Sequence, residues 1–77
     1  MILDEAGLTW RYESTEAVND TGGLMRLYRC VEHPRITKIV QRPHRDEPWV
    51  ERYYVQGLAN WWRMPRNALE ALRENPA

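Results

Sequence analysis

The sequence predicts a small α+β domain: an antiparallel meander sheet of three to five strands, with a C-terminal amphipathic helix packed on one face. Two observations predict this fold. Short runs of β-branched and aromatic residues alternate with clear turn signals, which is typical of sheets built from hairpins. One window after Pro65 repeats its apolar residues with helical spacing. Because 77 residues contain no repeat and no linker, we expect one domain over residues 1–77.

Four breakers divide the chain. The strongest is NDTGG at 19–23, whose paired glycines can adopt positive φ. His33-Pro34 favours an extended or turn conformation at the histidine. The segment RPHRDEP at 42–48 has proline near both ends and charge between, and Gln56-Gly57 predicts another reversal.

The runs between these breakers predict strands at 8–14, 24–32, 35–42 and 49–55. The last two read as a hairpin closed by a loop of about six residues. The run 24–32 also fits a helical template, but nine residues between breakers are short for a helix. We therefore expect a strand there.

Two interpretations of residues 58–64 remain open. The segment LANWW pairs back on 49–55 across a two-residue Gln56-Gly57 hairpin, or it forms a helical turn before Pro65. The helix after it is clearer, because proline suits a first helical position. Its apolar stripe consists of Met64, Ala68, Leu69 and Leu72. We expect about ten residues, with Arg73 in the last turn and a stop at Asn75-Pro76.

The charges are unevenly placed although the net charge is zero. Residues 1–20 carry five acids against Arg11, a net of −4, and residues 26–45 carry six basic residues against Glu32, a net of +5. Such asymmetry is typical of a nucleic-acid footprint or of a self-complementary surface.

Several classes of protein are not expected. Cys30 is the lone cysteine, so no disulfide forms within the chain, and a reducing cytoplasmic compartment is the natural prediction. We expect no signal peptide and no membrane helix. Cys30, His33 and His44 do not complete a four-ligand metal site, so neither a metal nor a cofactor is expected. His44 beside Asp46-Glu47 reads as a solvated loop rather than a catalytic site, and we predict no enzymatic activity.

The segment 49–62 holds five of the eight aromatic residues of the chain. Strand alternation puts Trp49 and Tyr53 on one face and Tyr54 on the other, and it separates Trp61 from Trp62. One short helix covers only one sheet face, so part of this aromatic set remains for a partner. We predict an interaction module that self-associates, as a homodimer, or docks on a protein partner, with some of these aromatics in the core. The predicted partner-binding residues are Trp49, Arg52, Tyr54, Trp61, Trp62 and Arg63.

The alternative is a nucleic-acid-binding accessory or regulatory protein. A basic ribbon followed by stacking aromatics suits single strands or RNA, although no RNA-binding or zinc-finger motif is present. Basic residues that alternate with apolar ones are also typical of a solvated sheet face. The residues that this alternative uses are Arg26, Arg29, Lys38, Arg42 and Arg45.

Overall fold

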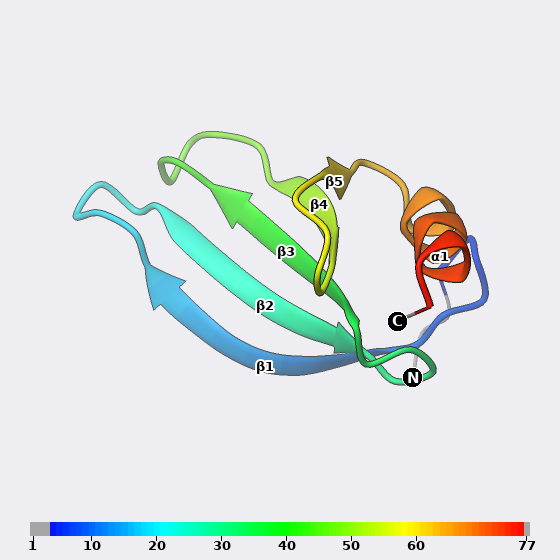
Figure 1. Cartoon of the computed structure of the whole chain (residues 1–77). Helices are drawn as coiled ribbons and strands as arrows, with labels where there is room; N and C mark the ends of the chain where they lie inside the picture. The colour runs from blue at the N-terminus through cyan, green and yellow to red at the C-terminus, as the bar shows by residue number, and fades with distance from the viewer. Residues whose placement is uncertain (1–3, 77) are drawn as a thin grey trace.

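The structure is a computed structural model that describes residues 4–76. It is a five-stranded antiparallel sheet in the order β1-β2-β3-β4-β5, with one helix at an end of the sheet (Figure 1). The elements are β1 (Trp10–Ala17), β2 (Leu24–Cys30), β3 (Ile36–Arg42), β4 (Val50–Val55), β5 (Trp61–Trp62) and α1 (Pro65–Glu74). The predicted meander and C-terminal helix are both confirmed.

Two open points of the sequence are resolved. Residues 24–30 form a strand, as expected. Trp61 and Trp62 also form a strand, which pairs with Tyr54 and Tyr53. The two-residue hairpin is wrong, however: a turn at Gln56-Gly57, closed by Leu58 N–H donating to Val55 O at 3.0 Å, is followed by further loop up to residue 60.

The register divides the sheet into two faces, which we name by what covers them. The helix-bearing face includes Trp10, Cys30, Ile36, Tyr53 and Val55, which lie in register across four strands. The open face carries the alternate residues of the same strands, and within residues 4–76 no helix packs on it. In β1 a bulge shifts the alternation by one residue, because the register moves between Tyr12 and Ser14 and leaves Glu13 without a register partner on β2.

The core lies at one end of the helix-bearing face. It consists of Leu8, Cys30, Ile36, Tyr53, Val55, Ala68 and Leu69. Here α1 and the N-terminal segment cover the sheet, while the remainder extends past the helix to the hairpin loops (Figure 1). Burial raises the pKa of the Cys30 thiol, which is free. The core therefore uses only part of the aromatic set.

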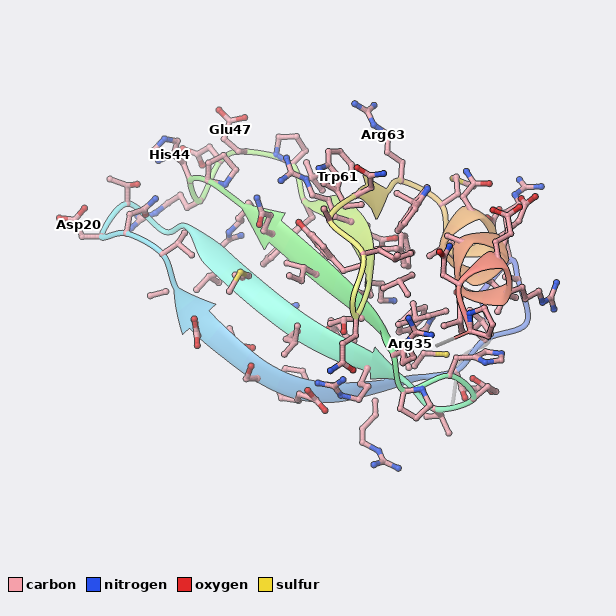
Figure 2. The ribbon with its side chains drawn as sticks, in the orientation of Figure 1. Asp20, Arg35, His44, Glu47, Trp61 and Arg63 are labelled. Atoms are coloured by element: carbon pink, nitrogen blue, oxygen red, sulfur yellow. The ribbon has the colours of Figure 1, made fainter. Side chains whose placement is uncertain are left out.

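Arg35 ties the end of the helix to the sheet. Its Nη1 donates to Asn75 O at 2.7 Å, and its Nη2 donates to Gln56 O at 2.9 Å. Carbonyls at a helix C-terminus lack partners within the helix, so this guanidinium supplies one (Figure 2). Arg35 thus has a structural role within the basic segment.

The β1–β2 and β3–β4 loops are bonded side by side at the far end. Asn19 Nδ2 donates to Pro43 O at 2.7 Å, and Arg45 N–H donates to Thr21 O at 3.1 Å. Thr21 Oγ1 and His44 Nδ1 lie 2.6 Å apart. Figure 2 shows His44 and Glu47 at this tip, far from the helix.

Glu32 fixes the N-terminal segment to the end of β2, and this contact predicts an acid sensitivity. Thr9 Oγ1 donates to Glu32 Oε2 at 2.6 Å and Thr9 N–H donates to Oε1 at 2.9 Å, which lowers the pKa of Glu32 from 4.5 to about 2. A carboxyl with a depressed pKa in the folded state stabilises above its unfolded pKa, and this contribution is lost as the pH falls toward 2. Urea midpoints measured from neutral to acid pH should fall less steeply in Glu32→Gln than in the wild type. Glu47→Gln, at an exposed loop position, is the control, and an unchanged slope in Glu32→Gln would contradict the assignment.

Candidate interaction surfaces

An aromatic–arginine cluster lies at the β4–β5 edge of the open face. Arg52 Cζ lies 4.6 Å from the ring centroid of Trp61, and Arg63 Cζ lies 5.9 Å from it. Tyr54 is the cross-strand partner of Trp61, whose side chain is 39% exposed. Figure 2 shows Trp61 and Arg63 at the outer edge of the sheet. The structure thus brings together four of the six residues predicted to bind a partner.

Arg52 has an unusual polar environment. Its Nε is buried and has no hydrogen-bond partner within residues 4–76. A buried donor without a partner costs about 1–3 kcal/mol. The guanidinium is also held over the Trp61 ring, where cation–π attraction offsets part of this cost.

Apolar side chains extend this cluster across the open face. Leu27 and Ile39 face each other on β2 and β3, and Arg52 is the next partner on β4. Met25 and Val50 lie on the same side nearer the loops, and Val50 is 45% exposed. The face therefore has an apolar centre that no other element of the described residues covers.

The β1 edge of the open face supplies acid. Glu16 lies opposite Met25, and Glu13 pairs with Arg29 through two contacts, Nε–Oε2 at 2.8 Å and Nη2–Oε1 at 3.2 Å. The hydrogen bond lowers the pKa of Glu13 and raises that of Arg29. The open face thus has Glu13 and Glu16 with Arg11 along β1, Arg29 on β2, and Arg52 and Arg63 along β4 and β5.

Trp49 and Trp62 lie apart from this cluster. Trp62 is on the helix-bearing face, where it is partly buried against the core. Trp49 comes just before β4, with Arg26 Cζ 4.7 Å and Arg42 Cζ 4.8 Å from its ring centroid. The predicted six residues are therefore divided between the two faces, because adjacent positions on a strand point in opposite directions.

A second surface occupies the uncovered part of the helix-bearing face. Lys38 Nζ lies 4.9 Å from the Trp10 ring centroid and 5.0 Å from that of Tyr28. Tyr12 meets Tyr28 edge to face at 5.7 Å between centroids. We call this surface the cation–aromatic patch: Tyr12, Arg26, Tyr28, Lys38, Arg42 and Trp49. It contains three of the five basic residues that were predicted to bind nucleic acid.

The other two basic residues lie elsewhere. Arg29 points to the open face, where it bonds Glu13 and donates to Pro34 O at 2.9 Å. Arg45 belongs to the β3–β4 loop and packs beside Gly22. Tyr12 was not among the residues predicted from the sequence. The sequence placed Tyr12 on an expected strand, but it did not show that Tyr28 would be its neighbour on β2.

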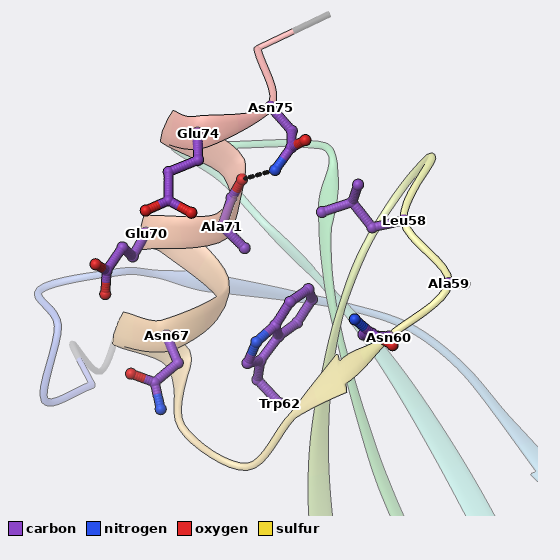
Figure 3. A pocket seen from close by; sticks show the side chains of 9 residues that line it. All are labelled: Leu58, Ala59, Asn60, Trp62, Asn67, Glu70, Ala71, Glu74 and Asn75. Carbon is purple, nitrogen blue, oxygen red and sulfur yellow. Dashed lines mark hydrogen bonds between the residues drawn. The ribbon is translucent and has the colours of Figure 1, made fainter.

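A groove of about 480 Å³ separates α1 from the β4–β5 loop (Figure 3). Its lining is mainly polar, with the Trp62 ring at its floor. The remaining lining residues are Leu58, Ala59, Asn60, Asn67, Glu70, Ala71, Glu74 and Asn75. Asn75 Nδ2 is already used, since it donates to Ala71 O at 2.9 Å. Of the residues predicted as sites, only Trp62 lines this groove.

Metal binding and membrane crossing each require a recognisable arrangement of residues. Within residues 4–76, no group of three or more His, Cys, Asp or Glu side chains is placed to hold a metal ion. In the same range, no helix combines the length and the apolar content needed to cross a membrane.

Comparison with protein-family models, curated proteins and solved structures gives no match to this chain. The candidate sites are therefore defined by the geometry of the described residues.

Proposed function

We propose that this protein is a non-enzymatic interaction module that self-associates through the open face. The observation that carries the proposal is the uncovered apolar centre of that face beside the Arg52–Trp61 cluster. Tryptophan, tyrosine and arginine are the residue types enriched at interface hot spots. A stable single layer of sheet needs a second layer on each apolar face, and α1 supplies only one of them.

A second copy of the chain can lie on this face with its β1 edge against the β4–β5 edge. In an isologous dimer, a two-fold axis parallel to the strands lays β1 of one copy across β4 and β5 of its partner. The β1 acid Glu16 then approaches Arg52 and Arg63, while Arg11 on the same edge faces the row of Tyr54 and Trp61. Two flat sheets pack about 10 Å apart, a spacing that the side chains of Leu27 and Ile39 fill. A net charge of zero adds no overall repulsion between copies.

Removing the Trp61 ring tests this interface. Sedimentation equilibrium across a micromolar concentration series should show a monomer–dimer equilibrium for the wild type. Trp61→Ala should raise the dimer Kd at least tenfold, because hot-spot tryptophans contribute about 2 kcal/mol or more. The side chain is 39% exposed in the monomer, so its loss should leave the fold intact.

Trp49→Ala is the matched control, since Trp49 is 37% exposed but belongs to the other face. It should leave the dimer Kd unchanged. A wild type that stays monomeric throughout the series would refute self-association. An equal rise of the dimer Kd in Trp61→Ala and Trp49→Ala would refute the open face as the interface.

We also infer a reducing, cytoplasmic setting and no catalytic role. The lone thiol Cys30 is free and buried, which suits a structural cysteine in a reducing compartment. His44, Asp46 and Glu47 are exposed on a loop whose histidine contacts Thr21, so their position favours a structural role.

A further inference from the structure

We propose that the cation–aromatic patch binds single-stranded nucleic acid. The patch is on the opposite side of the sheet from the proposed dimer interface, so the two proposals stand or fall independently. Single strands are bound by positive side chains that follow the backbone and by aromatic rings that stack on bases. The patch combines both kinds of group on one surface.

The cations of the patch are not neutralised by carboxylates. Within residues 4–76, no ion pair involves Arg26, Lys38 or Arg42. Arg42 Nε donates to Gly22 O at 3.0 Å, which orients the guanidinium without cancelling its charge. Glu51 is an acid on the same face, and it accepts a hydrogen bond from Tyr53 Oη at 2.8 Å. Arg26 is exposed, Lys38 and Arg42 are half-buried beside aromatic rings, and these three cations outnumber the one carboxylate of Glu51.

The strands set the spacing of these charges. Lys38 and Arg42 are four residues apart on β3, so they point the same way about 13 Å apart. Arg26 lies on β2 opposite Val40, midway between them. The Arg26 and Arg42 guanidinium groups converge on the Trp49 ring, and Lys38 Nζ lies over Trp10 and Tyr28. The three charges thus follow the line of the strands, with two of them close together at one end, and a phosphate backbone can follow this line.

Exposed rings flank this line. Tyr12 is 55% exposed on the β1 side, and Trp49 is 37% exposed on the β4 side. Such rings stack on unpaired bases, whereas a duplex keeps its bases inside. The rings therefore favour a single strand over a duplex, and also over an acidic peptide, which has no bases to stack.

The shape of this face also favours a narrow ligand. The helix α1 stands above the same face at one end, as Figure 1 shows. A second sheet approaching the patch would meet the helix, but an extended single strand can cross the open part beside it. The helix thus limits what can bind the patch, whereas no helix of the described residues limits access to the open face.

Fluorescence anisotropy with a labelled oligothymidylate or oligouridylate of about twelve nucleotides tests the proposal, a length within the usual site size. With three phosphate contacts, log K should fall against log salt concentration with a slope of about −2. Arg26→Gln should reduce the steepness of this slope by about 0.7. Tyr12→Leu should weaken binding roughly tenfold and leave the slope unchanged, since it removes stacking rather than charge.

Arg11→Gln is the matched control for Arg26→Gln. Both arginines are exposed and lie on neighbouring strands, but Arg11 points to the other face. It should leave the affinity and the slope unchanged. Absence of binding at about 50 mM salt, equal affinity for a duplex or for polyglutamate, or an equal loss in Arg11→Gln would each overturn the proposal. Circular dichroism of every variant checks that the fold is retained.

Discussion

Replacing Ile36 with alanine is expected to lower the free energy of unfolding by about 2–5 kcal/mol, measured by urea denaturation. Ile36 is 0% exposed and is the cross-strand partner of Val55 beneath the helix. Truncation leaves a cavity between two layers that cannot close, because the sheet and α1 are fixed by many other contacts. A domain of this size has a total stability of about 4–12 kcal/mol, so this one change removes a large part of it.

Ile39→Ala is the matched control for this experiment. Ile39 is on the same strand but on the open face, where it is only partly buried. At concentrations too low for self-association, its truncation should cost no more than about 1 kcal/mol, because few contacts are lost. Equal losses at both positions would contradict a core confined to the helix-bearing face.

Replacing Gly22 with alanine is expected to cost about 2–5 kcal/mol in the same assay. Gly22 has a φ of +86°, where a side chain costs roughly 1–2 kcal/mol. A Cβ at this position would also lie 2.5 Å from Arg45 Cβ and 3.0 Å from Arg45 N. Relief of that overlap requires the β3–β4 loop to move, which adds about 1–3 kcal/mol.

Gly7→Ala separates the two causes. Gly7 has a φ of +76°, but a Cβ there would meet nothing within 4 Å. Its replacement should therefore show the backbone cost alone, about 1–2 kcal/mol. Equal losses at the two glycines would mean that contact between the loops does not matter. Because Gly22 O also accepts from Arg42 Nε, Gly22→Ala should additionally disturb the cation–aromatic patch.

The loop contact shows how fold and candidate sites are coupled. The β1–β2 and β3–β4 loops are joined through Asn19, whose Oδ1 also accepts from Thr21 N–H and Gly23 N–H at 3.0 Å each. These bonds lie at the end of the sheet that the helix does not cover. They join the two loops beyond the last β2–β3 pair, Leu24 and Arg42, and Arg42 belongs to the cation–aromatic patch.

The groove beside α1 has a different character from the two surfaces. It joins the Trp62 ring with the carboxylates of Glu70 and Glu74. The partner-binding prediction included Trp62 for its residue type, and the structure places its ring between sheet and helix. Its removal is therefore expected to affect helix packing before it affects any partner.

Much of the architecture could be predicted from local sequence. Breakers such as Gly22-Gly23 and Gln56-Gly57 mark the reversals, and Pro65 marks the start of the helix, because backbone preferences act within a few residues. Alternation along a strand correctly assigned Tyr53 and Tyr54 to opposite faces, and likewise separated Trp61 from Trp62. These properties belong to single strands and need no knowledge of neighbours.

Only the tertiary structure decided which distant side chains meet. Lys38 lies between Trp10 and Tyr28, residues from three strands, and the β1 bulge at Glu13 fixes which later residues of that strand share a face with them. Strand register depends on pairing between segments far apart in the chain, which local pattern does not encode. The sequence by itself thus determined the meander, the helix and the alternation of the aromatics. The pairing of the strands and the position of the helix decided that these aromatics serve two separate surfaces, because a short helix buries only the end of one face.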